Sequence, residues 1–294
     1  MFTIFELVSA GKLTTNINLS PHSIDVSLGV ICHEDRNCIS TVSSLLVRAS
    51  QSNTPIKRVE CRDCSCSCLQ DLITLFEILS TSSSLISVRI PPYSIDLITR
   101  SISYIDMIQS NDVSSLLTAL QSKIPIKRVE CRGSSLDSND DIIRLLQIIS
   151  VSKSVIFTDL HPHQVDVDKG VLLFRPYKII QMNTTTVSAL KCFFQCFIMK
   201  ALTLTRFRFS NDTITSLCDL IKTNTSLTSV DFSECGLSDV ALSQIIQALN
   251  IGSSALSSIN FGSNSMGVKS TLALSEALKQ NSSPNYDCFT VQFY

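Results

Sequence analysis

The chain has 294 residues, 44% of them hydrophobic and 17% charged, a composition typical of a globular protein that can bury an extended core. Its 24 basic and 25 acidic residues give a net charge of -1, which argues against a general attraction to nucleic acid or to an anionic membrane. No stretch approaches about 18 uninterrupted apolar residues, and the opening MFTIFELVSAGK lacks the basic start of a secretory signal. We therefore expect a soluble, cytoplasmic protein.

Two short motifs recur along the chain. PHSID at 21–25 returns as PYSID at 92–96 and as PHQVD at 162–166, and PIKRVECR at 55–62 returns unchanged at 125–132. Such recurrence is typical of repeat proteins, because an enzyme needs one set of reacting groups whereas a stacked structure needs each unit again. We expect one domain over 1–294, with duplicated units at 21–91, 92–161 and 162–226, regular repeats of about 29 residues at 227–281, and a cap or irregular end at 282–294.

Strand and helix patterns alternate within these units. In the octapeptide, Val59 and Cys61 alternate with charged residues, which predicts a strand with one buried face. The run at 71–80 and its copy at 141–150 have the apolar spacing of a short helix. Strand then helix, repeated, predicts a parallel sheet backed by helices. The eight predicted strands centre on Ile17 and Leu19, Val59 and Cys61, Val88 and Ile90, Val129 and Cys131, Thr158 and Leu160, Phe207 and Phe209, Val230 and Phe232, and Ile259 and Phe261.

The spacing of these strands is uneven. Across the segments that carry the PxSID motif, the step is longer, about 41 to 49 residues, so each segment holds either an insertion or an extra strand such as VSLGVI at 26–31. The spacing does not distinguish these alternatives. The step from Leu204 to Leu227 is shorter than a regular repeat, which predicts a turn without a complete helix.

The C-terminal part carries a recognisable pattern. LxxLxLxxCxL from Leu227 to Leu237 is followed one repeat later by LxxLxLxxNxL from Leu256 to Met266, with the helical sequences VALSQIIQALN and STLALSEALKQN between and after them. These residues resemble leucine-rich repeats of the ribonuclease-inhibitor-like class, which includes nucleotide-binding innate receptors, tropomodulin-like actin regulators and the GTPase-activating protein of Ran. The resemblance implies an α/β solenoid of about eight turns, with a curved parallel sheet on the concave side and helices on the convex side.

The same resemblance assigns a structural task to one position of each repeat. The residue that follows the strand is expected to hydrogen-bond backbone groups where the chain leaves the sheet. Cys64, Cys235 and Asn264 occupy this position.

The exposed side of the predicted strands carries the candidate binding residues. They are Arg58, Glu60, Arg62, Arg89, Arg128, Glu130, Arg132, Asp159, Arg206, Arg208 and Asp231. These side chains are either solvated charges, whose exact repetition reflects a recent duplication, or a protein-binding platform. Arginines held in rigid rows lose little freedom on binding and make bidentate contacts with carboxylates. We predict that the arginines of the two octapeptides contact an acidic protein partner.

Four cysteines at 61–68 raise the question of a metal site. Cys61, Cys64, Cys66 and Cys68 include a CxxC pair that is compatible with zinc. The sister copy reads CRGSSLDS and lacks the later cysteines, which favours reduced thiols that act as small core residues. We expect no metal and no cofactor.

The two histidines of HPH are a second candidate metal pair. His163 aligns with His22 and Tyr93 in the repeated PxSID motif, which favours a structural loop residue over a ligand, and His161 is its neighbour. The chain has no nucleophile elbow, phosphate-binding glycine loop or metalloprotease helix, so we expect no enzymatic activity.

Two function classes remain. The preferred one is a non-enzymatic interaction module or scaffold that binds a protein through the concave sheet surface, without nucleic acid or membrane. The other is a regulator of a GTPase or of actin, as the resemblance to the Ran GTPase-activating protein and to tropomodulin-like proteins implies; the final SSPNYDCFTVQFY lacks the acidic character expected of such an activator. Use outside the cell would be indicated by occupied glycosylation sites or disulfides.

Overall fold

The computed structural model describes residues 17–19, 22–25, 30–33, 57–61, 79, 87–90, 93–104, 126–131, 138–152, 154–160, 162–252, 256–280 and 290–292. The chain forms two compact units: unit 1 comprises 1–134 with 152–155, and unit 2 comprises 135–151 with 156–294. Its described elements are α/β, and parallel strand pairs outnumber antiparallel ones.

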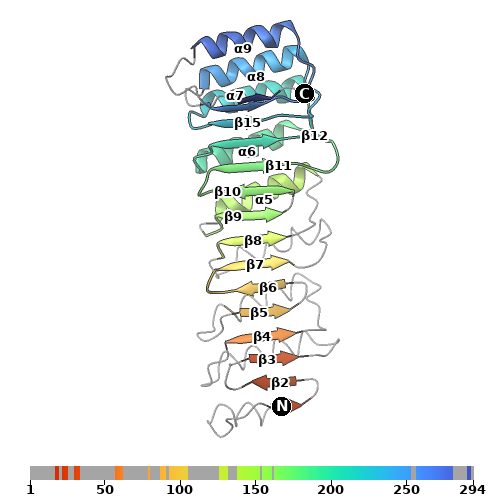
Figure 1. Ribbon diagram of the computed structural model, residues 1–294, viewed down its shortest axis with the longest axis vertical. Coiled ribbons are helices and arrows are strands. Elements are labelled where there is room, and N and C mark those ends of the chain that lie inside the picture. The colour runs from red at the N-terminus through yellow and green to blue at the C-terminus, as the bar shows by residue number, and fades with distance from the viewer. Residues whose placement is uncertain are drawn as a thin grey trace. The chain divides into compact units, whose positions relative to one another are not determined.

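The described strands of unit 1 form a sheet in which neighbours in the chain are neighbours in space. They are β1 (Ile17–Leu19), β2 (His22–Asp25), β3 (Val30–His33), β4 (Arg58–Cys61), β5 (Ser87–Ile90), β6 (Tyr93–Asp96), β7 (Ser101–Tyr104) and β8 (Arg128–Cys131) (Figure 1). β2 and β6 run antiparallel to both of their neighbours, whereas β3, β4 and β5 are parallel to one another, as are β7 and β8.

The PxSID motif is a strand, which resolves the uneven spacing. All three copies start a four-residue strand at the second motif residue and are followed by a further strand. The first two long steps therefore hold two extra strands each, and the third, which ends at the strand predicted at Phe207, holds four. In β6, Tyr93 and Ile95 face the core with 5% and 1% exposure. Asp96 ends the strand, and its Oδ1 accepts hydrogen bonds from the amides of Ile98 and Thr99 at 2.8 and 3.0 Å. The motif thus encodes an antiparallel strand together with the turn that follows it.

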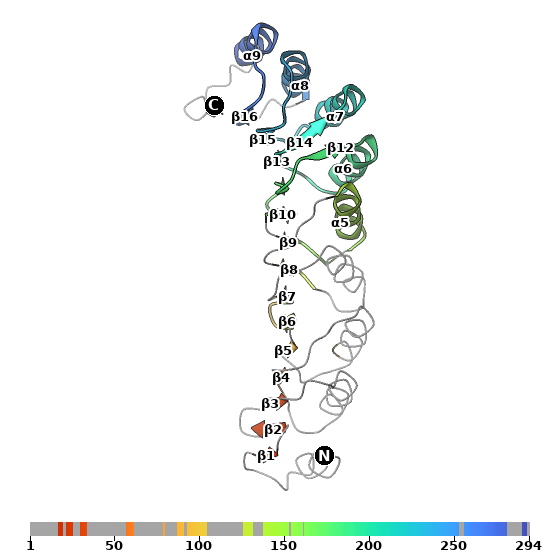
Figure 2. The same cartoon turned by 90° about the vertical axis from the view of Figure 1, so that its right-hand side faces the viewer.

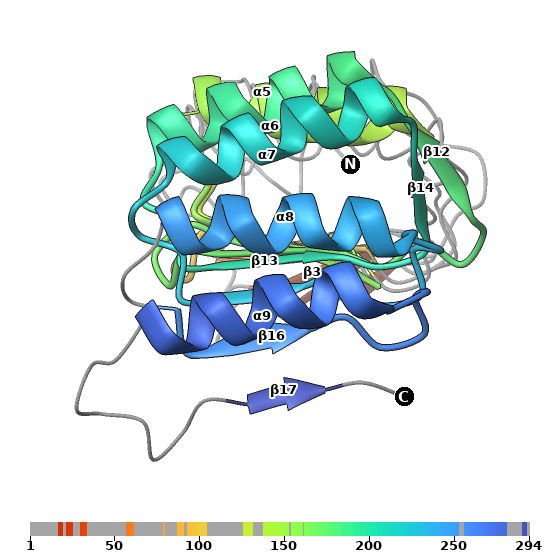
Figure 3. The same cartoon turned by 90° about the horizontal axis from the view of Figure 1, so that it is seen from above.

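Unit 2 combines a main sheet with a layer of helices. The main sheet contains β9 (Phe157–Leu160), β10 (His163–Asp166), β11 (Val171–Phe174), β13 (Ala201–Leu204), β15 (Ser229–Asp231), β16 (Ser258–Asn260) and β17 (Thr290–Gln292). β10 is antiparallel to β9 and β11, and every pairing from β11 onward is parallel. The final strand β17 pairs with β16, so the C-terminal segment that fits the repeat pattern poorly supplies an edge strand (Figure 3).

The described helices of unit 2 lie side by side on one face of this main sheet. They are α5 (Asn139–Val151), α6 (Thr184–Cys196), α7 (Asn211–Thr223), α8 (Asp239–Gly252) and α9 (Val268–Gln280) (Figure 2). α5 confirms the helix predicted at 141–150, and its buried stripe is the predicted apolar one. Of the first copy of that helix only Leu79 lies within the described residues, and it is helical and buried.

Polar residues define where these helices begin. Asn183 precedes α6 and its Oδ1 accepts from the amide of Thr186 at 2.8 Å, and Ser210 precedes α7 and its Oγ accepts from the amide of Thr213 at 3.3 Å. Each cap satisfies an amide that has no partner within its helix.

The strand predicted at Phe207 and Phe209 exists but does not join the main sheet. It is β14 (Phe207–Phe209), which pairs with β12 (Ile180–Met182) in a separate two-stranded sheet. The main sheet takes β13 instead, whose Leu202 and Leu204 are fully buried. The predicted register was wrong because the repeat that precedes Leu227 starts at Met199 and not at Leu204. The helix expected to be incomplete is α7, which has 13 residues and is complete.

The residue after the strand makes the predicted backbone contacts. Asn264 Nδ2 donates to the carbonyl oxygens of Phe232 at 2.8 Å and Phe261 at 2.9 Å, and its Oδ1 accepts from the amide of Leu237 at 2.9 Å. One repeat earlier, Cys235 Sγ donates to the carbonyl oxygen of Leu204 at 3.0 Å. This position therefore joins successive turns, as the sequence predicts, while Cys64 lies outside the described residues.

Candidate functional site

The two octapeptide copies present the same charged pair on one face of the unit 1 sheet. Val59 in β4 and Val129 in β8 are completely buried, whereas the side chains of Arg58 and Arg128 are 57% and 51% exposed. The predicted alternation of buried and exposed residues is confirmed in both strands. Arg62 and Arg132 lie outside the described residues.

Each of these arginines already has a carboxylate neighbour on its own strand. Arg58 Nη1 lies 3.6 Å from Glu60 Oε1, and Arg58 Nε donates to Ser87 Oγ at 3.3 Å. Arg128 Nε forms an ion pair with Glu130. Exposed pairs of this kind contribute about 0–1 kcal/mol to stability, so a partner can displace them at little cost.

Serines and two further charged residues separate the two charged pairs. The strand register aligns two rows across β4 to β8, and these rows are Arg58, Ser87, Asp96, Ser101 and Arg128, and Glu60, Arg89, Ser94, Ser103 and Glu130. The two arginine–glutamate pairs are four strands apart, which corresponds to roughly 19 Å at the usual strand spacing of about 4.8 Å. The residues between the two pairs are therefore four serines together with Asp96 and the exposed Arg89, which lies beside Glu60.

In unit 2, Asp231 has a local structural task. Its Oδ1 accepts from the amide and the hydroxyl of Ser233 at 2.9 and 2.7 Å, which closes the turn after β15. Asn260 does the same one repeat later by accepting from the amide of Gly262 at 2.9 Å. Asp159, the other acidic candidate, lies on β9 directly opposite Gln164 and is half-buried.

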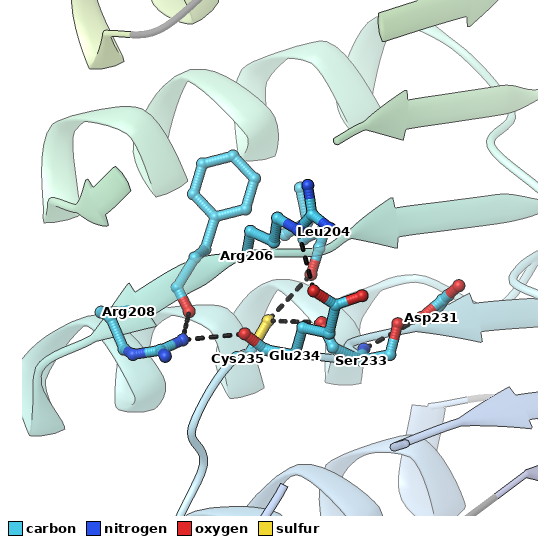
Figure 4. Close-up of polar contacts among 8 residues, drawn as sticks. Leu204, Arg206, Arg208, Asp231, Ser233, Glu234 and Cys235 are labelled. Atoms are coloured by element: carbon cyan, nitrogen blue, oxygen red, sulfur yellow. Dashed lines mark hydrogen bonds and ion pairs between the residues drawn. The ribbon is translucent and has the colours of Figure 1, made fainter. Parts of the chain in front are cut away.

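Arg208 is held against the backbone of the neighbouring turn. Its Nη1 donates to the carbonyl oxygen of Glu234 at 2.8 Å and more weakly to that of Phe207 at 3.4 Å (Figure 4). Gly236 leaves space for it, because a Cβ at Gly236 would lie 3.0 Å from Arg208 Cζ. Arg208 therefore joins β14 to the turn after β15, and it does not lie on the face of the main sheet.

Arg206 is the most available of the predicted residues in unit 2. It lies in the turn between β13 and β14, and its Nε contacts Glu234 Oε2 at 2.8 Å; Figure 4 shows the two side chains pointing toward each other. Their side chains are 45% and 49% exposed. Arg175, which follows β11, adds a second exposed guanidinium, with its Nη2 3.6 Å from Asp231 Oδ2.

Sequence reasoning missed Glu234 and Arg175. Glu234 and Arg206 are equivalent positions of two successive repeats, because β13 and β15 pair with Thr203 opposite Asp231. This equivalence could be found only once the repeat was known to include β13. Arg175 follows β11, a strand that the eight predicted strands did not include.

His163 is a core residue in a strand, so its assignment to a loop was wrong. It is the first residue of β10, is 1% exposed, and packs its ring 5.7 Å from that of Phe174. Its Nδ1 accepts from the amide of Arg175 at 3.3 Å. Within the described ranges no three His, Cys, Asp or Glu side chains come close enough to hold a metal ion; Cys64, Cys66, Cys68 and His161 lie outside those ranges.

Three described cysteines behave as core residues. Cys131, Cys218 and Cys235 are buried, and burial raises the pKa of the Cys218 thiol to about 11 and that of Cys235 to about 12. Both remain protonated at neutral pH, as the hydrogen bond donated by Cys235 requires. Cys192 and Cys196 on α6 are exposed.

A comparison of the chain with models of known protein families and with curated proteins finds no match. Among the described helices, none combines the length and the apolar character needed to span a bilayer.

Proposed function

We propose that the chain is a leucine-rich-repeat solenoid that binds a protein partner through the exposed face of its sheet and catalyses no reaction. The fold part of this proposal is supported by the parallel order β11, β13, β15 and β16, in which helices connect strands that stay in register. It is also supported by Asn264 and Cys235, which bond backbone groups of adjoining turns at the position that leucine-rich repeats use.

The function part is carried by one observation: the duplicated arginine–glutamate pair on unit 1. Burial accounts for Val59 and Val129, but it does not account for Arg58 and Arg128, whose side chains are more than half exposed. Rigid strands hold both guanidinium groups, so little side-chain entropy is lost when a partner carboxylate engages them. Two such groups at a fixed separation favour a partner with two acidic sites, because the second contact forms at high effective concentration.

The balance of charge on this face favours a protein over a nucleic acid. Arg58, Arg89 and Arg128 are accompanied by Glu60, Asp96 and Glu130, so positive and negative groups are interspersed. Nucleic-acid binding relies on an excess of positive charge along the phosphate backbone. Interspersed charge instead suits a protein surface with complementary charges.

The proposal is tested by charge reversal with a matched control. The double variant Arg58→Glu/Arg128→Glu and the control Lys57→Glu/Lys127→Glu change the same charge in the same two octapeptides, and both lysines are exposed next to the strands. After circular dichroism confirms folding, each protein is used to capture partners from a cell lysate for quantitative mass spectrometry. We expect the arginine variant to lose proteins that the wild type and the lysine variant retain. Equal capture by all three proteins would show that this face is only solvated.

A further inference from the structure

The turns that follow the strands of unit 2 bring several charges together. We name Arg175, Arg206, Arg208, Asp231 and Glu234 the rim cluster. The amide of Thr205 donates to the carbonyl oxygen of Phe174 at 3.1 Å, so the chain passes Arg175 and Arg206 in adjacent turns. The amide of Arg206 in turn donates to the carbonyl oxygen of Ser233 at 3.4 Å, which places Glu234 in the next turn.

Arg206 and Glu234 have a backbone conformation that favours smaller residues. Their φ angles are 63° and 59°, and Ser263, one repeat later, has 58°. Glycine adopts this left-handed region without steric cost, and asparagine does so more easily than residues with long side chains. The backbone therefore does not explain an arginine and a glutamate at these two places. The ion pair between the two side chains is a feature that this backbone conformation does not require.

The members of the rim cluster differ in how firmly they are held. Arg208 is fixed by backbone carbonyl groups, and Asp231 by the amide and hydroxyl of Ser233. In contrast, Arg206 uses only Nε and Glu234 only one carboxylate oxygen for their mutual contact, and both are about half exposed. Arg175 approaches Asp231 at 3.6 Å, and this is its one polar side-chain contact among the residues that the structure describes. The Arg206–Glu234 pair is thus the exchangeable part of the cluster.

We propose that Arg206, supported by Arg175, binds a carboxylate of an acidic segment of a protein partner, and that Glu234 occupies this place in the free protein. Arg206 Nε, which Glu234 occupies in the free protein, and a terminal nitrogen form a guanidinium fork that donates two parallel hydrogen bonds to a carboxylate. A partner carboxylate on this fork has to displace Glu234. Glu234 is therefore an intramolecular competitor. This inference rests on the proposed function, because it presupposes a protein partner.

The charge of the rim cluster supports an anion as the ligand, and the contact already present favours a carboxylate. Three arginines and two carboxylates leave one net positive charge, and this rises to two when Glu234 is displaced. A carboxylate that replaces Glu234 keeps the net charge at one, whereas a phosphate dianion would bring it to zero. The group that occupies Arg206 in the free protein is itself a carboxylate, which favours a carboxylate ligand, and competition with phosphate separates the two. The exposure of the pair makes the exchange sensitive to salt.

Glycine variants test this inference without straining the backbone. Arg206→Gly and Glu234→Gly remove the side chains at left-handed positions where glycine is well suited, and Ser263→Gly is the matched control at the same point of the next turn. The probe is a fluorescein-labelled decapeptide of alternating glutamate and glycine, titrated into the full chain at low salt with anisotropy detection. A peptide with glutamine in place of glutamate is the uncharged probe.

The signs of the expected effects are opposite for the two partners of the ion pair. Arg206→Gly should weaken glutamate-peptide binding about tenfold, through loss of charge-assisted hydrogen bonds. Glu234→Gly should strengthen it about threefold, through removal of an exposed competing ion pair, and Ser263→Gly should leave it unchanged. Absence of binding by Glu234→Gly, weaker binding by that variant, or equal binding of the glutamine peptide would overturn the inference. Displacement of the peptide by equimolar inorganic phosphate would also overturn it, since it would indicate a general anion site.

The two proposals can fail separately. Suppose that Arg58→Glu/Arg128→Glu loses lysate partners but peptide binding does not respond to Glu234→Gly. This result would reject the role of the rim cluster and retain the proposed function. If the peptide results are as expected but Arg58→Glu/Arg128→Glu captures the same partners as the wild type, the role of the unit 1 face would be rejected instead.

Discussion

Replacement of Asn264 by alanine should destabilise unit 2 through the backbone groups that its side chain satisfies. Asn264 Nδ2 serves the carbonyl oxygens of Phe232 and Phe261 and its Oδ1 serves the amide of Leu237, at distances between 2.8 and 2.9 Å. A net value of about 1 kcal/mol for each of these hydrogen bonds predicts a loss of about 2–3 kcal/mol. This is a large part of the roughly 5–15 kcal/mol that a typical domain has.

The chain itself suggests the control for this variant. Cys235 fills the same position one repeat earlier and donates to a backbone carbonyl, so Asn264→Cys should retain part of the stability that Asn264→Ala loses. Urea unfolding followed by circular dichroism gives the free energy of unfolding, and hydrogen exchange of the Leu237 amide reports the local effect. A loss below about 0.5 kcal/mol for Asn264→Ala, with unchanged protection of Leu237, would refute the assignment of this position as a link between turns.

Three further predictions concern acid stability, thiol reactivity and a tight turn. The pKa of Asp239 is lowered from 3.8 to about 2, first by the side-chain hydrogen bond from Ser270. Its stabilising effect is therefore complete above about pH 4 and is lost as the pH falls toward 2. When the free energy of unfolding is measured against pH, Asp239→Asn should lack this loss of stability in acid. Mass-spectrometric mapping of brief iodoacetamide treatment of the native protein should find Cys192 and Cys196 alkylated and Cys235 protected, and modification of all three would contradict the burial of Cys235. Gly170→Ala should lower the thermal midpoint, because φ is 68° and the added Cβ would lie 2.5 Å from a backbone carbonyl oxygen, whereas an unchanged midpoint would show that the turn relaxes freely.

The octapeptide shows what a local sequence pattern can predict. Alternation of Val59 with Arg58 and Glu60 predicts which side chains are buried, and the structure confirms it in both copies, since a strand directs successive side chains to opposite faces. The PxSID motif shows the limit of the same reasoning. Tyr93 and Ile95 have equally clear alternation, but a period of two is the same for parallel and antiparallel strands, so it does not reveal that β6 reverses direction.

The rim cluster depended on tertiary structure still more strongly. Arg206 was identifiable as an exposed charge, but its partner Glu234 lies in the next repeat and meets it only because successive turns stack in register. The predicted repeat started at Leu204 in place of Met199, and this shift was enough to assign Arg206 and Arg208 to the main sheet, whereas Arg206 lies in a turn and Arg208 in the separate sheet of β12 and β14.

The amino-acid sequence by itself determined the repeated strand and helix segments, the buried side of each octapeptide and the linking position of Asn264 and Cys235. These features depend on short-range periodicity, which side-chain geometry and the burial of apolar groups impose within a few residues. Only the tertiary structure decided the direction of the PxSID strands, the separate pairing of β12 with β14 and the meeting of Arg206 with Glu234. Those outcomes depend on which backbone groups, distant in the chain, form hydrogen bonds with one another, and no local sequence pattern predicts that pairing.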